Sequence, residues 1–160
     1  MADKNAVTII AFSGDLDKLF ASFTIATGAA ASGMKVSMFF TFWGLKLIQQ
    51  EGSKPKGLNW MQKMFSWMVK PGTEKRSLSK LNMFGAGPAM LKKLMKKSKV
   101  PSLKEMMTAA RSMGVKMTAC TTSMEVMGIT KESLSPEVDN IAGVTSFLAE
   151  AKESSMTLFI

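Results

Sequence analysis

The chain has 160 residues, of which 46% are hydrophobic, and it carries a formal net charge of +9 at pH 7. This length and apolar content predict a single domain with a sizeable core. The single cysteine and the lack of histidine exclude an internal disulfide, Ser-His-Asp and Cys-His catalysis, and the usual thiolate or imidazole metal sites. We therefore expect no metal, no cofactor and a reducing, cytoplasmic setting.

The first predicted elements are a strand, a helix and a second strand. Val7–Gly14 is a short apolar run rich in β-branched residues, which indicates a buried strand, and Ser13 is positioned to cap the helix that follows. That helix runs to about Ala31 and Gly33 ends it, before a second buried strand over Lys35–Phe42. Two strands joined by a helix form a βαβ unit, which implies a parallel sheet.

A strongly basic, Met-rich segment at about 46–99 follows the second strand. It holds 13 of the 21 Lys and Arg residues and two of the 12 Asp and Glu residues, so its net charge is +11 while the remainder carries −2. The charge is therefore confined to one insertion-like segment without a recognisable nucleic-acid-binding module, which argues against nucleic acid as a partner. The lysine run near its end is typical of a solvated helix face. It is also suited to docking an acidic carrier protein or steering an oxyanion, through Lys92, Lys93, Lys96 and Lys97.

An apolar stripe at helical spacing lies in the same segment. It consists of Met61, Met64, Phe65 and Met68, widened by Trp60 and Trp67. Three readings remain open: a lid over the site, an oligomer or partner surface, and a helix on a membrane surface. We favour burial in an oligomer or against a partner, because amphipathic helices usually bury their apolar face on protein.

The pattern of helices and strands resumes after Pro101. Ser102 and Glu105 form a capping box, and the helix that they begin ends at Gly114. Val115–Cys120 is then a third apolar run that predicts a strand.

The last quarter of the chain continues the alternation. Thr122 and Glu125 form a second possible capping box, which predicts a short helix that ends at Gly128. A short strand over Glu137–Gly143, a helix over "VTSFLAEAKE" and a terminal strand in "SMTLFI" complete the chain. Strands that alternate with helices predict a three-layer α/β fold with a mainly parallel sheet of five strands.

The single cysteine falls at the carboxyl end of a predicted strand and just before a helix. In parallel sheets, ligands bind outside the carboxyl ends of strands where the strand order reverses. In a 2-1-3-4-5 order, that reversal would place Cys120 beside the Ser13-Gly14 loop. A helix start favours a thiolate, but free cysteines are often buried and inert. Position alone therefore leaves a structural and a reactive Cys120 equally open.

Several stretches resemble the DsrE/DsrF-like sulfurtransferase family, and more narrowly its stand-alone DsrE-like branch, sometimes labelled peroxiredoxin-like. The most specific are "FFTFWGL" and "AC-x-x-SM-x-VMGI", supported by "TIIAFSGDLDKLFASF", "PSLKEMMTAARSMGVKM" and the closing "TLFI". The resemblance covers nearly the whole chain. It implies one DsrE-like domain over 1–160, a flavodoxin-like fold with strand order 2-1-3-4-5, and a homo-oligomer, with a trimer or hexamer favoured.

The resemblance also implies a role for the cysteine. Active members carry sulfane sulfur on a cysteine as a persulfide or thiosulfonate and exchange it with TusA-like carriers and rhodaneses, and the family cysteine matches Cys120. This supports a sulfur carrier or sulfurtransferase. The peroxiredoxin label fits less well, because Thr118 lies two residues before the cysteine instead of three and the proline of that motif is missing. The alternatives are a non-catalytic module that binds a small anion or nucleotide-like ligand, and a peripheral membrane protein attached through Trp60–Val69.

The predicted pocket residues lie at the carboxyl ends of the first three strands. They are Ser13, Gly14, Phe42, Trp43, Gly44, Thr121, Thr122 and Ser123. The hydroxyl groups can hydrogen-bond a bound sulfur species and the aromatic side chains can wall the pocket. Simple turns, helix caps and core packing would account for several of the same residues.

Overall fold

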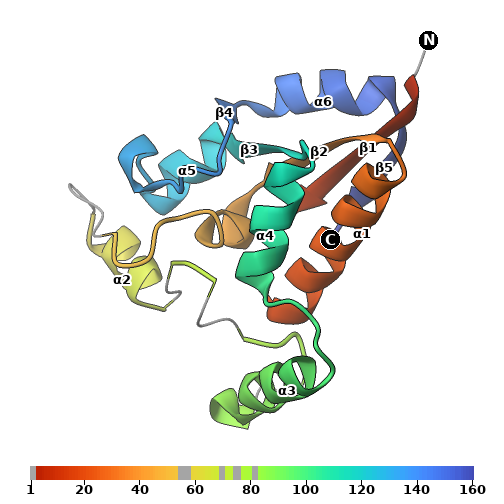
Figure 1. Cartoon of the computed structure of the whole chain (residues 1–160). Coiled ribbons are helices and arrows are strands. Elements are labelled where there is room, and N and C mark those ends of the chain that lie inside the picture. Colours follow the sequence, from red (N-terminus) through yellow and green to blue (C-terminus); the bar gives the residue numbers. More distant parts are fainter. Residues whose placement is uncertain (1–2, 54–58, 69–70, 74–76, 81–82) are drawn as a thin grey trace.

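The computed structural model describes residues 3–160 except 54–58, 69–70, 74–76 and 81–82 (Figure 1). The strands are β1 (Asp3–Ala11), β2 (Lys35–Phe40), β3 (Lys116–Cys120), β4 (Asn140–Ala142) and β5 (Ser154–Phe159). The helices are α1 (Leu16–Ala31), α2 (Trp60–Met68), α3 (Ala86–Lys97), α4 (Leu103–Ser112), α5 (Thr121–Met127) and α6 (Val144–Glu153). Short 3-10 turns occur at η1 (Phe42–Lys46), η2 (Met83–Gly85) and η3 (Lys131–Ser133). This alternation confirms the predicted α/β class.

The five strands form one parallel sheet in the order β4-β3-β2-β1-β5. The parallel, five-stranded sheet agrees with the sequence prediction, but the strand order differs from 2-1-3-4-5. In the predicted order β2 would lie at an edge, whereas here it pairs with β1 on one side and β3 on the other. The reason lies in its side chains: Met38, Phe39 and Phe40 are all buried, so both faces of β2 are covered, as in a central strand.

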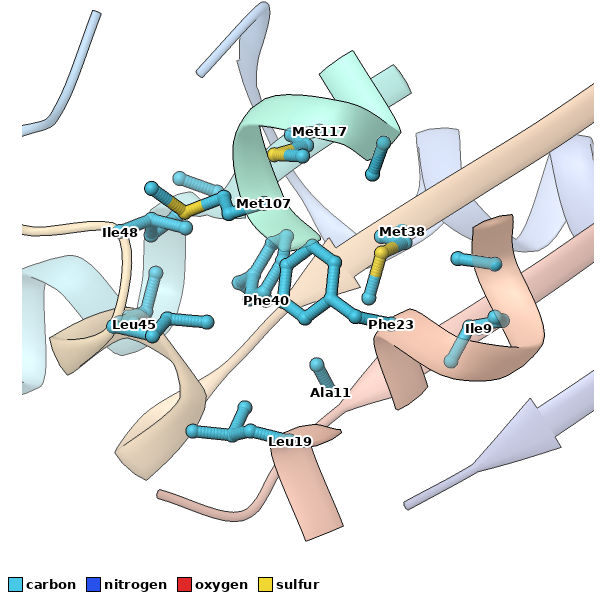
Figure 2. Close-up of a cluster of buried hydrophobic side chains, with 14 of the residues drawn as sticks. Ile9, Ala11, Leu19, Phe23, Met38, Phe40, Leu45, Ile48, Met107 and Met117 are labelled. Carbon is cyan, nitrogen blue, oxygen red and sulfur yellow. The ribbon is translucent and has the colours of Figure 1, made fainter. Parts of the chain in front are cut away.

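The larger core lies on the sheet face that α1 and α4 cover (Figure 1). Alternate strand residues such as Ile9, Met38 and Met117 point into it and meet Phe23 of α1 and Met107 of α4 (Figure 2). The opposite face is covered by α6, which contacts β1 and β5. Because successive side chains of a strand point to opposite faces, every second residue of β2 and β3 faces α6 instead.

Two helix boundaries follow the predicted signals closely. Ser102 and Glu105 form the predicted capping box at the start of α4. Gly33, with φ +79°, follows the end of α1 as expected for a residue in the left-handed region. Each signal consists of residues within one turn of the helix end that it specifies, so it can be recognised from the sequence alone.

Two other caps were predicted wrongly. The N-cap of α1 is Asp15, and the Ser13 hydroxyl instead accepts a hydrogen bond from the Asp15 backbone N–H at 3.2 Å and donates to its carboxylate at 3.1 Å. The N-cap of α5 is Cys120, so Thr122 lies inside the helix and forms no capping box with Glu125. In each case the observed cap lies two residues from the candidate cap.

The first two strands end earlier than predicted, at Ala11 and Phe40, and η1 follows β2. A Cβ atom added to Gly44 would lie 2.0 Å from the carbonyl oxygen of Ala11, and the Gly44 backbone N–H donates to the Phe12 carbonyl at 2.9 Å. This close approach of two backbones requires glycine and turns the chain out of the sheet after Phe40.

The basic segment contains the two predicted helices, α2 and α3. Part of it, 77–80, binds the start of α1, where the Leu16 backbone N–H donates to the Ser77 carbonyl at 2.7 Å and the Ser79 backbone N–H donates to Asp17 at 3.1 Å. Burial raises the pKa of the Asp17 carboxyl, but the hydrogen bonds from Ser79 outweigh it and the net shift of the pKa is downward. Within the described ranges, no helix has the length and apolar character that a membrane span requires.

Candidate functional site

Cys120 is the last residue of β3 and is 5% exposed. Its side chain lies on the sheet face that α6 covers, in a small cluster with Phe39 of β2 and Phe147 of α6. The two rings lie 4.8 Å apart between their centroids. The cysteine therefore lies beneath a single layer of aromatic side chains and outside the larger core shown in Figure 2.

The carboxyl ends of β3 and β4 form the point where the connections diverge. The chain leaving β3 returns along the α1 and α4 face, where Met127, Ile129 and Leu134 join the larger core. The chain leaving β4 enters α6 on the opposite face. In parallel sheets such a divergence opens a crevice at the carboxyl edge, and Cys120 lies there opposite Ala142 of β4. The divergence was expected between the first and third strands, so the strand pair differs from the prediction.

A cavity of about 240 Å³ lies between this edge and α6, next to the cysteine cluster. Its lining residues are Phe39, Thr118, Asn140, Ile141, Ala142, Ser146, Phe147 and Glu150. Phe39 and Phe147 belong both to the cavity wall and to the cysteine cluster. The cavity therefore reaches the immediate surroundings of the thiol.

The Ser13-Gly14 loop does not lie beside Cys120, because β2 separates β1 from β3. It packs instead against η1: a Cβ atom added to Gly14 would lie 3.1 Å from the carbonyl oxygen of Trp43. The structure thus brings Ser13, Gly14, Trp43 and Gly44 together at the ends of β1 and β2, one strand away from the thiol.

The aromatic residues after β2 also face away from Cys120. Phe42 is 42% exposed and adopts φ +45°, and its ring lies 5.8 Å from Phe12, which stacks on Phe159 of β5 at 5.5 Å. Trp43 packs against the larger core. These side chains therefore wall the β1 and β5 end of the carboxyl edge.

The three hydroxyl residues after the cysteine have different surroundings. Thr121 is half-buried and Thr122 is exposed. Ser123 is 2% exposed, and its hydroxyl lies 2.6 Å from that of Thr41, which links α5 to the end of β2. Ser123 thus positions the helix that begins at the cysteine.

The four predicted docking lysines lie on α3, and they differ in their surroundings. Lys92 and Lys96 line a cavity of about 350 Å³ between α3 and the start of α4, together with Lys104. Lys93 and Lys97 are exposed. Figure 1 shows α3 beyond the N-terminal end of α4, far from α5 and α6. The basic surface is therefore separate from the cysteine.

The described part of the Met-rich stripe is exposed. Trp60, Met61 and Met64 are 73%, 53% and 45% exposed, and the side chains of 65–68 lie outside the described residues. The helix rests on α5, since the Gln62 side-chain amide donates to the Glu125 carbonyl at 3.1 Å. Trp60, Met61 and Met64 therefore remain largely exposed in a single chain.

Sequence reasoning missed the residues of the cavity beneath α6. One signal was available, because Thr118 precedes Cys120 by two residues and a strand points such residues to the same face. Asn140, Ser146 and Phe147 gave no local signal, since only the return of α6 across the sheet brings them to the carboxyl end of β3.

Comparison with known proteins identifies the family. The model of the DsrE/DsrF/DrsH-like family matches residues 3–159. The chain belongs to this family. The protein "Uncharacterized protein YrkE" of Bacillus subtilis (strain 168) is 42% identical over 153 residues, which cover 96% of this chain and 95% of that protein. "Sulfur carrier protein DsrE2" of Allochromatium vinosum is 30% identical over 164 residues, 99% of each chain.

A solved structure of another protein supports the fold assignment. The crystal structure of the ychN protein from E. coli superposes with a TM-score of 0.56, covering 98% of this chain and 99% of that chain. The identity is 14%, so the likeness concerns the fold alone.

Proposed function

We propose that this member of the DsrE/DsrF/DrsH-like family is a sulfur carrier that holds sulfane sulfur as a persulfide on Cys120. The observation that carries the proposal is the place of the only cysteine, at the end of β3 where the connections diverge and beside a cavity. A relative that matches nearly the full length of the chain is named a sulfur carrier protein. A persulfide carrier needs one nucleophilic thiolate and no metal.

The proposed chemistry consists of two thiol–disulfide exchanges. In loading, the Cys120 thiolate attacks the outer sulfur of a donor persulfide, R–S–SH. A bond forms between that sulfur and Sγ, the donor S–S bond breaks, and its electron pair leaves on R–S⁻ while the proton stays on the transferred sulfur. In unloading, an acceptor thiolate attacks the outer sulfur of Cys120–S–SH and releases the Cys120 thiolate. The chain holds no second cysteine, so the acceptor thiol belongs to another molecule.

The basic helix α3 supplies the docking surface for the acceptor in this proposal. It carries four lysines and no acidic residue, and Lys93 and Lys97 are exposed. Opposite charges steer association at long range. An acidic carrier protein, such as a TusA-like protein, or a rhodanese therefore suits this surface.

The proposal includes a homo-oligomer, with a trimer or hexamer favoured. Trp60, Met61 and Met64 lie close together on α2 and are largely exposed. Exposed apolar patches of this kind mark interaction surfaces. Contact with further copies of the chain would cover them.

Transfer of sulfur tests the function. The protein is loaded with a low-molecular-weight persulfide, freed of donor by desalting, and mixed with an acceptor thiol. We expect one sulfur atom per chain to move to the acceptor, and none from Cys120→Ser treated in parallel. If the wild type and Cys120→Ser deliver equal amounts of sulfur, the carrier role of this cysteine is wrong.

A further inference from the structure

One hydroxyl group in the wall of the cavity beneath α6 has no hydrogen-bond partner among the described residues. Thr118 lines this cavity, is 7% exposed, and lies two residues before Cys120 on the same face of β3. Among the residues that the structure describes, its side-chain oxygen makes no hydrogen bond. Among the described residues, the fully enclosed side-chain atom without a partner is Ser53 Oγ, so the Thr118 oxygen is still open to the cavity. The Thr118 hydroxyl is therefore available to a ligand in the cavity.

Two other hydroxyl groups near the α6 side of the sheet differ from Thr118 in this respect. Thr8 of β1 is hydrogen-bonded to Ser154. Ser37 of β2 donates to Glu150 at 2.6 Å. The hydroxyls of Ser146 and Thr157 also make no hydrogen bond among the described residues, but both residues are exposed. Thr118 differs from them because it is buried, on the strand that ends in the cysteine.

The charges around the cavity define the ligands that it fits. Asn140, Ser146 and Thr118 contribute neutral polar groups. Among the described lining residues Glu150 is the charged one, and none is Lys or Arg. The Glu150 carboxylate accepts from Ser37 and pairs with Lys116 at 3.1 Å. A thiosulfate dianion here would lose hydration and meet a carboxylate, and the described residues of the cavity wall would offer it no Lys or Arg, which is unfavourable.

An organic persulfide in its protonated form, R–S–SH, meets none of these obstacles. Its sulfur atoms would contact the rings of Phe39 and Phe147, and sulfur packs favourably against aromatic rings. Those two rings also contact Cys120, so sulfur held against them lies next to the thiol. The volume of about 240 Å³ accommodates a molecule of roughly ten non-hydrogen atoms or fewer.

We propose that the cavity beneath α6 is the donor site, that it takes the protonated form of a small organic persulfide without other charged groups in preference to thiosulfate, and that the Thr118 hydroxyl positions this donor for attack by Cys120. The inference rests on the proposed function and uses the loading step given above. It separates the donor site from the lysine-lined cavity at α3, whose charge suits anions or acidic partners.

The first test compares two donors by intact mass. Hydroxyethyl persulfide and thiosulfate are offered separately, and each loading rate is divided by the rate of the same donor with glutathione, which removes differences in intrinsic reactivity. We expect the corrected rate for the persulfide to exceed that for thiosulfate by at least roughly tenfold. Equal corrected rates would overturn the donor preference.

The second test removes the hydroxyl group. Thr118→Val should slow loading from hydroxyethyl persulfide about five- to tenfold, the effect of one hydrogen bond between neutral groups, and Thr118→Ser should restore it. Alkylation of Cys120 by iodoacetamide should be unchanged in both variants, which separates positioning from damage to the fold. Thr157→Val, which removes an exposed hydroxyl from the edge strand β5, should load as the wild type does.

The third test reverses the preference. Asn140 is exposed and lines the cavity, so Asn140→Lys should fold and place a cation there. We expect its corrected rate with thiosulfate to rise about tenfold over the wild type, since an opposite charge at close range favours the anion. If Thr118→Val and Asn140→Lys both load as the wild type does, the donor site is wrong while sulfur carriage on Cys120 stands. If neither donor loads the wild type, both proposals fail.

Discussion

At the scale of single residues, the geometry at the carboxyl edge depends on Gly44. A Cβ atom at this position would lie 2.0 Å from the Ala11 carbonyl oxygen, which is backbone and cannot rotate away. Gly44 therefore sets the distance between η1 and β1. The "FFTFWGL" stretch that includes Gly44 resembles the family, but the sequence does not show why glycine is needed there. The contact with the Ala11 backbone supplies that reason.

Gly44→Ala should destabilise the fold by about 3 kcal/mol, because two backbones must move apart. Gly28→Ala is the matched control. Gly28 is exposed within α1 and an added Cβ there meets no atom within 4 Å, so the change should be neutral or stabilising by up to about 1 kcal/mol. Urea denaturation of the two variants measures both effects. Equal stabilities would show that the close approach is not a constraint in solution.

At the scale of elements, helix ends marked by a local sequence signal were predicted better than helix starts that have several candidate caps. The capping box of α4 and the glycines that end α1 and α5 were read correctly, since each signal lies within a few residues of the helix end that it specifies. The caps at Ser13 and Thr122 were wrong because two or more polar residues compete at each helix start. The sequence alone does not decide between these candidates.

The helix α3 carries its own prediction. Lys93→Glu with Lys97→Glu should slow sulfur transfer from the loaded protein to a TusA-like carrier by about tenfold or more at low salt, and the difference should shrink as salt screens exposed charges. Loading of Cys120 from a small persulfide should stay unchanged, because Figure 1 shows α3 far from α5, the helix that begins directly after Cys120. Rapid mixing with a chemical quench, followed by intact mass measurement, gives the rates of loading and of transfer.

The control for these substitutions is Lys152→Glu, an exposed lysine in the last turn of α6. It changes the net charge in the same direction without touching α3. If Lys152→Glu slows transfer as much per charge as the α3 variant does, net charge and not a docking surface governs the rate.

At the scale of the whole molecule, the fold class followed from the alternation of strands and helices, but the strand order did not. The alternation of apolar residues predicts which side chains of a strand are buried, but it does not predict which strands pair with it. The burial of both faces of β2 marks it as central, and the run "VSMFF" contains that information without naming the partner strands. The cavity beneath α6 could not be predicted for the same reason, because its walls come from distant parts of the chain.

The exposed part of α2 makes a prediction about assembly. We expect a discrete homo-oligomer, a trimer or hexamer, by light scattering, and Met61→Asp with Met64→Asp should dissociate it, because charges cannot be buried in an apolar contact without a large penalty. Circular dichroism should show retained helix and strand in the variant. A wild-type monomer that sediments with anionic vesicles would instead support attachment to a membrane surface.

Sulfur carriage on Cys120 is tested most directly by the intact mass of the wild type and Cys120→Ser after exposure to a small persulfide donor. We expect that the wild type gains the mass of one sulfur atom, that a reductant reverses the gain, and that Cys120→Ser gains nothing. A wild type that stays unmodified, under conditions in which glutathione is persulfidated, would show that Cys120 does not carry sulfur.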